Sequence, residues 1–162
     1  MEIRKVTLDD ASRICSIYNY YIVNTAITFE TEPVKEDEMK QRIADIINEG
    51  LPYYVGVIDG KIVGYYYIHK WNNRCAYSST KEVSIYLDKD QKGKGLGSIL
   101  FDHLFKNVDR EKVHVLISGI TIPNDNSVKL HEKFGFKQAS HMKEIGRKFE
   151  EWRDVGHWQI IL

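Results

Sequence analysis

Hydrophobic and polar residues follow two rhythms along this chain. Residues 2–7 and 81–87 alternate between polar and apolar positions, as strands with one buried face do. In 11–22, 34–47 and 96–104 the apolar residues recur every three or four positions, which is typical of amphipathic helices. These segments therefore predict two strands and three helices.

Residues that favour turns separate these segments. Positions 7–10 have the spacing of a capping box in front of the first helix, and Gly50 stands where the second helix should end. Asp59 and Gly60 form a dipeptide that often closes a tight hairpin. We therefore expect two more strands within 52–71.

The second half of the chain adds one helix and three strands. Residues 112–122 are apolar enough for a strand buried on both faces, and a helix is expected between a cap at Asn124 and a break at Gly135. Two strands follow, at about 136–146 and 153–161. Hairpins near both ends and alternation in the middle predict an α/β fold, a mixed sheet with helices on both faces.

Composition narrows the class of protein. The 162 residues contain no repeat, low-complexity tract or linker, so we expect a single domain over 1–162. The 23 basic residues balance 23 acidic ones, so no overall charge attracts nucleic acid or an anionic membrane. No apolar run approaches the ~18 residues of a membrane helix. Cys15 and Cys75 lack metal or disulfide spacing, and free thiols in a reducing cytoplasm are favoured over a disulfide scaffold.

A glycine-rich loop, DQKGKGLGSIL at 90–100, lies between a predicted strand and a predicted helix. Backbone N–H groups and the positive end of a helix dipole bind phosphate groups at such a place. A P-loop is excluded because Gly97 is followed by Ser98 without a lysine, and the G-x-G-x-G spacing fits a dinucleotide-binding fold poorly. A flexible turn without a ligand is the alternative.

Two motifs together resemble the GNAT superfamily of N-acetyltransferases. Lys92, Gly95 and Gly97 take the places of the family's Arg/Gln-x-x-Gly-x-Gly/Ala pyrophosphate loop, with lysine for the usual Arg or Gln. Residues 124–136 are similar to its Asn-x-x-Ala/Ser-x-x-Leu-Tyr-x-x-x-Gly-Phe helix, with His131 at the tyrosine position. The resemblance implies a GNAT-type mixed, mostly antiparallel sheet of about seven strands with helices on both faces. It also implies acetyl-CoA as co-substrate, without a metal.

Three further segments narrow the resemblance to phosphinothricin and methionine sulfoximine N-acetyltransferases. These are 29–33, 71–87 and 150–162, so the likeness extends over essentially the whole chain. That subfamily also carries histidine at the position of His131. Its members look like homodimers, and we expect the apolar C-terminal strand, 156–162, to be an unpaired edge that a partner covers.

The resemblance implies a coenzyme A site around the loop. The pantetheine arm would lie along 85–87 as an additional strand, and a main-chain N–H near Leu87 would polarise the thioester carbonyl. The residues expected to bind the cofactor are Ile85, Tyr86, Leu87, Lys92, Gly93, Lys94, Gly95, Leu96, Gly97, Ser98, Asn124 and Asn126.

Acetyl transfer to an amine needs a base for the amine and a proton for the departing thiolate. Glu82 resembles the family's general base, and a water relay is expected because a glutamate pKa of about 4.3 is low for an ammonium proton. His131 is a candidate acid, since a histidine pKa of about 6.5 lies below that of a thiol. The structural alternatives are an exposed strand residue for Glu82 and a half-exposed helix residue for His131.

Recognition of the acceptor would fall to the segment before the predicted strand 81–87. The planar guanidinium of Arg74 could bind a carboxylate, although a surface cation on a hairpin loop is equally compatible with the pattern. Lesser hydrogen-bonding candidates are Tyr77, Ser79 and Thr80. The three tyrosines at 65–67 are expected to be packing residues. The tryptophans at 152 and 158 are expected in the core or at an interface. The remaining candidate, His157, reads as one more polar residue on a terminal strand.

These observations predict a cytoplasmic acetyl-CoA-dependent N-acetyltransferase. It would act on the amino group of a small amino-acid-like substrate by direct attack, because neither cysteine lies in a nucleophile motif. The alternatives are a non-catalytic acyl-CoA-binding regulatory domain and an acetyltransferase that acts on proteins or peptides.

Overall fold

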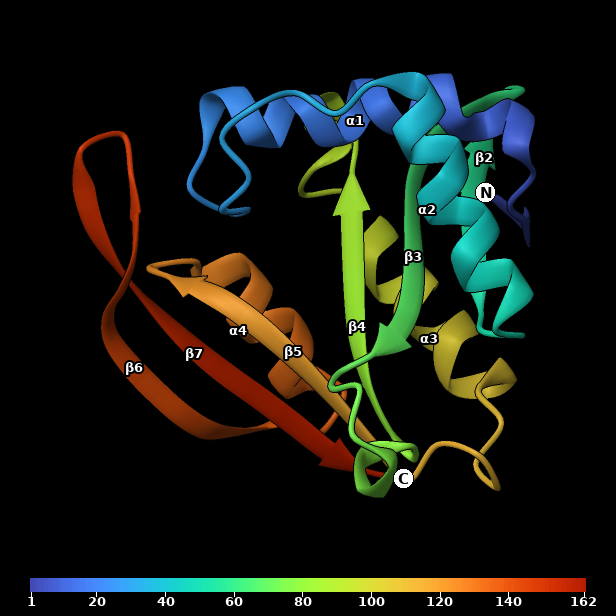
Figure 1. Cartoon of the computed structure of the whole chain (residues 1–162). Helices are drawn as coiled ribbons and strands as arrows, with labels where there is room; N and C mark the ends of the chain where they lie inside the picture. The colour runs from blue at the N-terminus through green and yellow to red at the C-terminus, as the bar shows by residue number, and fades with distance from the viewer. The chain divides into compact units, whose positions relative to one another are not determined.

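The computed structural model describes all 162 residues of the chain. Its helices and strands (Figure 1) are β1 (Glu2–Lys5), α1 (Ala11–Asn24), α2 (Glu36–Asn48), β2 (Tyr53–Ile58), β3 (Lys61–Lys70), β4 (Thr80–Leu87), α3 (Leu96–Asn107), β5 (Val115–Ile122), α4 (Asp125–Lys133), β6 (Lys137–Lys148) and β7 (Glu151–Ile161). The strands form one sheet in the order β1-β2-β3-β4-β5-β7-β6. The β4–β5 pair is parallel, and the pairs β1–β2, β2–β3, β5–β7 and β6–β7 are antiparallel. The predicted seven-stranded, mostly antiparallel sheet is confirmed.

The chain forms two compact units, each assembled from separate segments. The first comprises 1–20, 33–69 and 83–108. The second comprises 21–32, 70–82 and 109–162. The single domain over 1–162 stays a prediction.

The first unit places helices on both faces of β2 and β3 (Figure 1). Tyr65 is fully buried on the face where it lies beside Tyr53 and the side chains of α1 and α2. Tyr66 points to the other face, where its hydroxyl lies 2.7 Å from Nδ1 of His103 on α3. Alternation of neighbouring residues in a strand produces this division, and it confirms that these tyrosines pack on opposite faces.

Local signals specify the turns of the first unit as predicted. Asp59 and Gly60 both have positive φ, 50° and 73°, which a two-residue hairpin turn of this type requires. Before α1, the carboxylate of Asp10 accepts a hydrogen bond of 2.8 Å from the backbone N–H of Thr7. The same carboxylate accepts two more, of 2.7 and 2.8 Å, from the guanidinium of Arg4. Arg4 thereby lowers the pKa of Asp10 and ties β1 to the start of the helix.

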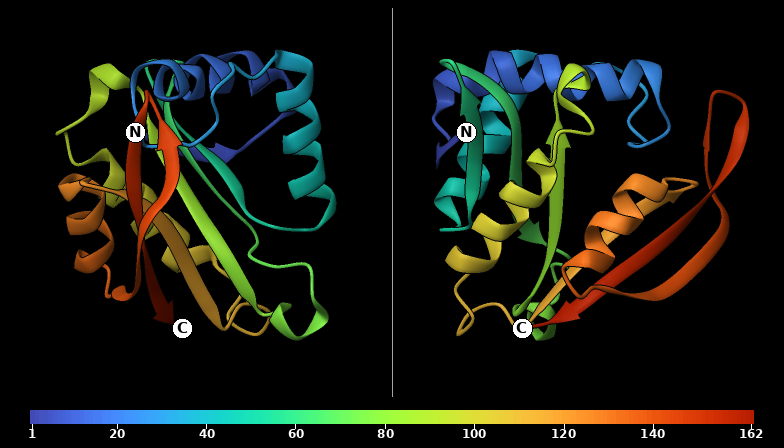
Figure 2. Two further views of the ribbon diagram at one scale, coloured as in Figure 1. Left: turned by 60° about the vertical axis from the view of Figure 1, so that its left-hand side comes forward. Right: turned by 180° about the vertical axis from the view of Figure 1, so that it is seen from behind.

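The second unit is formed around β5. The first three residues of β4, Thr80–Glu82, pair with β5 in parallel. The whole of β5 pairs with β7 on its other side. A long hairpin joins β6 to β7, and Figure 2 shows it as a twisted ribbon. Helix α4 is attached to this layer by Trp158, whose indole N–H donates a hydrogen bond of 3.2 Å to Glu132.

The expectation that the C-terminal strand is an unpaired edge is wrong. Strand β7 lies between β5 and β6, and the edges of the sheet are β1 and β6. The local pattern of 156–162 could not reveal this, because β6 and β7 exchange places relative to chain order. Of the two tryptophans, Trp158 is 3% exposed and belongs to the core, whereas Trp152 is 60% exposed.

Two simpler expectations concern the cysteines and the membrane. Cys15 is buried and Cys75 exposed, and both are free thiols as predicted. None of the helices has the length and apolar character that a membrane-spanning segment would need.

Candidate active site

The glycine loop of the first unit connects β4 to the N-terminus of α3. Gly93 and Gly95 have φ of 75° and 76°, and Gly95 is the residue that caps α3. No other atom lies within 4 Å of a Cβ built at either position, so glycine is required by the backbone conformation and not by crowding. The first N–H groups of a helix have no partner in a preceding turn. The loop therefore presents amide donors and a helix dipole to an anion.

Two lysines flank these amides. Lys94 donates a hydrogen bond of 3.0 Å to the side chain of Gln91, and the ammonium of Lys92 lies 5.6 Å from the centre of the Tyr20 ring. Both lysines are exposed. The loop consequently adds positive charge to its backbone donors, which suits a pyrophosphate.

Asp88, which was not among the predicted site residues, anchors the start of the loop. Its carboxylate accepts hydrogen bonds from Arg13 on α1 and, at 2.9 Å, from the backbone N–H of Asp90. Its own N–H donates to the carbonyl of Val63 on β3 at 2.8 Å. Burial raises the pKa of this carboxyl, but Asp90 and Arg13 outweigh it and lower the pKa. An aspartate side chain often accepts a hydrogen bond from the backbone N–H two residues later, and this preference could have identified the turn at Asp88.

Strand β4 approaches β3 closely just before the loop. A Cβ on Gly64 would lie 2.6 Å from Cδ2 of Leu87 and 2.9 Å from the carbonyl oxygen of Tyr86, so only glycine fits there. Residues 85–87 are half-buried. The main-chain donor expected near Leu87 and the pantetheine contact stay predictions.

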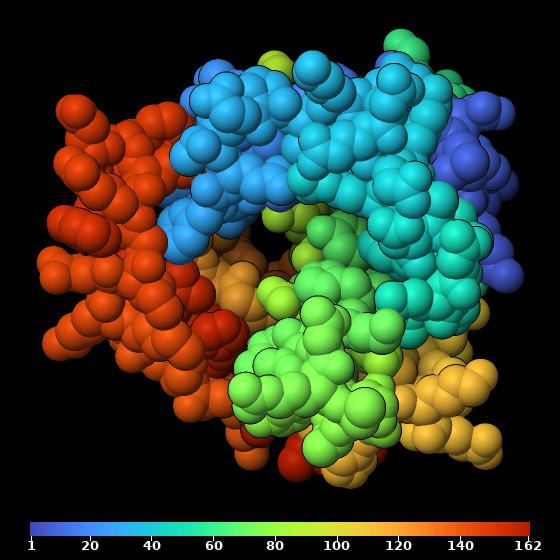
Figure 3. All heavy atoms as spheres, in the orientation of Figure 1, coloured from blue at the N-terminus to red at the C-terminus, as the bar shows by residue number.

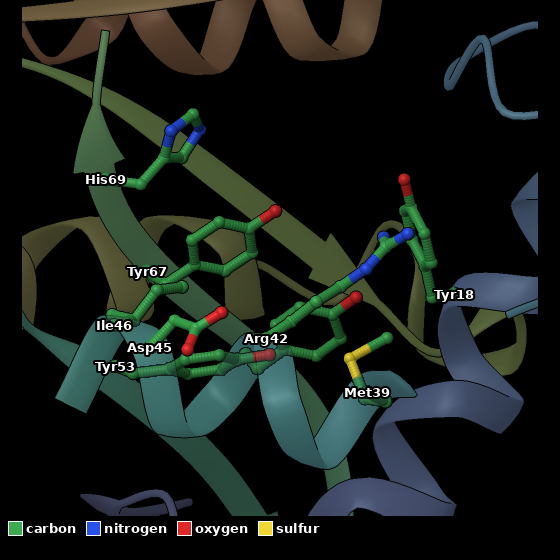
Figure 4. A pocket seen from close by; sticks show the side chains of 9 residues that line it. Tyr18, Met39, Arg42, Asp45, Ile46, Tyr53, Tyr67 and His69 are labelled. Atoms are coloured by element: carbon green, nitrogen blue, oxygen red, sulfur yellow. The ribbon is translucent and has the colours of Figure 1, made fainter. Parts of the chain in front are cut away.

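A cavity of about 280 Å³ opens in the first unit, with α1, α2, β2 and β3 as its walls (Figure 4). Four tyrosines dominate its wall, and burial raises the pKa of Tyr53 and Tyr65, so both phenols keep their protons. The rings of Tyr18 and Tyr65 also contact Tyr86 on β4, at centroid distances of 5.1 and 5.5 Å. The lining residues are Tyr18, Met39, Arg42, Asp45, Ile46, Tyr53, Tyr65, Tyr67 and His69.

The charged groups of this cavity come from α2. Figure 4 shows the side chain of Arg42 extending toward Tyr18, and Arg42 also pairs with Glu38 one turn earlier. Asp45 accepts a hydrogen bond of 2.7 Å from Gln41. An aromatic wall with one guanidinium at its rim could hold a small molecule that carries a carboxylate. Of these tyrosines, Tyr65 and Tyr67 were predicted from the sequence only to pack.

Glu82 belongs to the second unit, where it pairs with Ile117 on β5. Its Oε1 lies 3.7 Å from the position that Cβ would have in Gly119, two residues further along β5. Glu82 is half-exposed and Gly119 exposed. The carboxylate therefore faces an open space that glycine leaves above the strand.

His131 on α4 is only 1% exposed, which excludes the half-exposed position considered above. Its Nδ1–H donates a hydrogen bond of 2.7 Å to the carbonyl of Ser127, and its ring meets Phe136 edge-on at 5.1 Å. Burial lowers its pKa, and the bond to Ser127 only partly opposes this effect. The neutral ring thus carries its proton on Nδ1.

Asn124 caps α4, as predicted: its side-chain oxygen accepts a hydrogen bond of 3.3 Å from the N–H of Ser127. Asn126 is exposed on the first turn of the same helix. Contact of either asparagine with a cofactor stays a prediction.

The acceptor candidates lie in and beside the loop 71–79, bright green in Figure 3. Arg74 is exposed, and its backbone N–H donates a hydrogen bond of 2.9 Å to Asn72. The ring of Tyr77 packs edge-on against Trp71 at 5.2 Å. The carbonyl of Ser79 accepts a hydrogen bond of 2.8 Å from His114, and Thr80 pairs with Val115 where β4 begins. The loop is thus anchored at its end, while Arg74 extends from the middle of it.

No group of three or more His, Cys, Asp or Glu side chains is arranged to hold a metal ion.

Comparison with known proteins defines the class to which this fold and these groups belong. Residues 3–157 match the family model described as Acetyltransferase (GNAT) domain. The chain belongs to this family, whose members are acetyl-CoA-dependent N-acetyltransferases. The resemblance to the GNAT superfamily is thereby confirmed.

Particular relatives narrow the family further. A phosphinothricin N-acetyltransferase from Streptomyces viridochromogenes is 33% identical over 98% of this chain and 86% of its own length. An L-methionine sulfoximine/L-methionine sulfone acetyltransferase from Salmonella typhimurium is 30% identical over 100% of this chain and 95% of its own. The crystal structure of a phosphinothricin acetyltransferase from Sinorhizobium meliloti with AcCoA superposes with a TM-score of 0.95. It is 32% identical and covers 99% of this chain and 88% of that one.

Proposed function

We propose that this chain transfers the acetyl group of acetyl-CoA to the amino group of a small amino-acid-like acceptor, with Glu82 as general base. The observation that carries the proposal is the half-exposed carboxylate of Glu82 beside the open space over Gly119. An acceptor ammonium, or a water that relays its proton, could approach the carboxylate there. The names of the relatives support an amino-acid-like acceptor of the phosphinothricin or methionine sulfoximine type.

The reaction proceeds by direct attack of the neutral amine on the thioester carbonyl. Glu82 takes the proton from the ammonium, and a main-chain N–H near Leu87 stabilises the oxyanion. A covalent enzyme intermediate is not required. Cys15 would be a poor nucleophile, because burial raises the pKa of its thiol.

The donor is bound by the glycine loop. The amides of 93–97 and the ammonium groups of Lys92 and Lys94 hold the pyrophosphate, and 85–87 hold the pantetheine arm. The exposed backbone at Gly93 and Gly95 supports this assignment. Asn124 and Asn126 contact the same coenzyme from the first turn of α4.

For His131 the geometry favours a packing role over that of an acid. Its Nδ1–H is engaged by Ser127, so a donor at Nε2 would require the protonated ring, which burial disfavours. We expect His131→Asn to lower kcat by no more than about threefold, against the 100-fold or more typical of a lost acid or base. A 100-fold loss would restore His131 as the acid.

Two arginines compete for the acceptor carboxylate. Arg74 is favoured by its exposed, planar guanidinium, with Tyr77, Ser79 and Thr80 as further contacts. Arg42 is favoured by its place in the tyrosine-lined cavity. Since a bidentate arginine contact contributes about 2 kcal/mol, the arginine that binds should raise the acceptor KM about 30-fold when replaced by glutamine.

Steady-state kinetics of Arg74→Gln and Arg42→Gln decide between them. Each variant is the control for the other, because both remove one half-exposed or exposed guanidinium. The KM for acetyl-CoA should stay unchanged in both. An acceptor KM that changes in neither variant would contradict recognition of a carboxylate by arginine.

The transfer itself is tested with labelled acetyl-CoA and a panel of amino acids, phosphinothricin, methionine sulfoximine and a peptide. Transfer to the small acceptors is expected. Transfer only to the peptide would favour the protein-acetylating alternative. Binding of acetyl-CoA without any transfer would favour the regulatory one.

A further inference from the structure

Four strands of the second unit bring polar side chains to the space above Gly119. Gly119 on β5 pairs with His157 on β7, and His157 pairs with Ser140 on β6. Nε2 of His157 lies 3.7 Å from the position of a Cβ at residue 119, the same distance as Oε1 of Glu82 on β4. The carboxylate and the imidazole therefore adjoin one space from opposite sides.

Neither conformation nor crowding requires glycine at position 119. Its φ is outside the left-handed region, and a Cβ there would meet its nearest atoms at ordinary contact distances. Those nearest atoms belong to Glu82 and His157. The effect of the missing side chain is that these two groups share an exposed space without an apolar group between them.

The orientation of His157 is fixed from the other side. Its Nδ1 lies 2.8 Å from Oγ of Ser140. Gln138 pairs with Trp158 and Ser140 with His157, so Ala139 is an extra residue in β6. Without this bulge Ala139 would stand opposite His157, and alanine cannot form the hydrogen bond. The bulge thus places a hydroxyl where it holds one ring nitrogen, and Nε2 remains on the side of the ring that adjoins the space over Gly119.

We propose that His157 is a positioning residue that acts through Glu82. It accepts the proton that Glu82 has taken from the acceptor. Glu82 takes the proton from the acceptor ammonium. It passes that proton to the lone pair on Nε2 of His157, directly or through a water over Gly119. The Nδ1–H of the resulting imidazolium donates to Ser140, and the ring then releases the proton at Nε2 to solvent. Glu82 returns to its charged form, so one proton leaves for each amide bond formed.

This inference rests on the proposed function, and kinetics can separate the two. His157→Phe keeps a ring of similar size and removes the relay, whereas His157→Gln keeps a hydrogen-bonding group that cannot carry a proton onward. We expect both to lower kcat about tenfold at an unchanged acetyl-CoA KM, and imidazole in the buffer to restore part of the rate of His157→Ala. His141→Phe is the matched control, because His141 lies on the same hairpin but pairs with Asp154.

A double-variant cycle gives the sharpest result. If His157 acts through Glu82, adding His157→Phe to Glu82→Gln should lower kcat no further. The relay would be overturned if the double variant had a kcat tenfold below that of Glu82→Gln, or if His157→Gln had the wild-type kcat. Either result would leave the role of Glu82 as base unaffected. Absence of transfer by the wild-type protein would instead overturn the proposed function.

Two further measurements test the proposal even if the His157 variants do not fold. Gly119→Val fills the space without replacing either group, and we expect a similar tenfold loss. Ring ¹⁵N spectra of the wild-type protein and Glu82→Gln report on the contact without any turnover. The resonances of His157 should shift and those of His141 should not. Unshifted His157 resonances, or full activity in Gly119→Val, would contradict the proposal.

Discussion

Single residues differ in how far their neighbours along the chain determine their role. Glu82 could be selected because its place at the start of the strand that leads into the glycine loop resembles that of the family's general base. The burial of His131 could not be predicted, since α4 is polar and only the packed structure shows the ring against Phe136. The role of His157 could not be predicted, because the residues beside its ring, Gly119 and Ser140, lie on β5 and β6, which no local pattern connects to β7.

The buried state of His131 predicts a dependence of stability on pH. Its pKa is lower in the folded protein than the value of about 6.5 expected in the unfolded chain. Below that pH the unfolded chain binds the proton first, so stability falls as the pH drops through about 6.5 and continues to fall toward the folded pKa.

Urea unfolding at pH 7 and pH 5 measures this effect. The wild-type protein should lose more stability on acidification than His131→Asn. His103, whose pKa burial and Lys106 also lower, is present in both proteins and contributes equally. Equal losses in the two proteins would show that His131 is not held neutral by folding.

At the scale of elements, the turns were easier to predict than the contacts that fix them. The Asp59–Gly60 hairpin and the cap at Asn124 follow from residue types with known turn preferences. The anchoring of the glycine loop by Asp88 depends on Arg13, which is 75 positions away in the sequence. The close approach of β3 and β4 at Gly64 depends on two strands meeting, so the alternation of either strand contains no sign of it.

Gly95→Ala tests the role of the loop as an element. An alanine with φ near 76° costs about 1 kcal/mol, and the distorted loop should bind acetyl-CoA about tenfold more weakly. Gly60→Ala is the matched control: its φ is 73° and its Cβ would also meet nothing within 4 Å, but it lies in the β2–β3 turn. Calorimetric titration with CoA should distinguish them, and equal affinities would contradict the loop assignment.

Gly64→Ala tests the close approach of β3 to β4. The new methyl group would lie 2.9 Å from a backbone oxygen of Tyr86, so β4 must shift. We expect a loss of about 2 kcal/mol in the free energy of unfolding. Thermal denaturation measures this loss. A loss of stability no larger than that of Gly60→Ala would show that β4 shifts without destabilising the fold.

For the molecule as a whole, alternation and helical spacing predicted the class of fold and the approximate number of strands. They did not predict strand order, because hydrophobic pattern determines which face of a strand is buried and not which strand lies beside it. The supposed free edge at β7 was wrong for this reason. The homodimer now rests on the resemblance to the subfamily alone. Sedimentation equilibrium should give twice the chain mass of 18.9 kDa, and a value of one chain mass would contradict it.

The central claim is that Glu82 supports acetyl transfer to a small amino-acid-like amine. Its most direct test is the rate of labelled acetyl transfer to phosphinothricin, methionine sulfoximine and the amino acids by the wild-type protein and by Glu82→Gln, at saturating acetyl-CoA. We predict transfer to at least one of these acceptors by the wild-type protein and a loss of about 100-fold or more in the variant, with CoA affinity unchanged. Equal rates in the two proteins, or no transfer to any of these amines, would contradict the account.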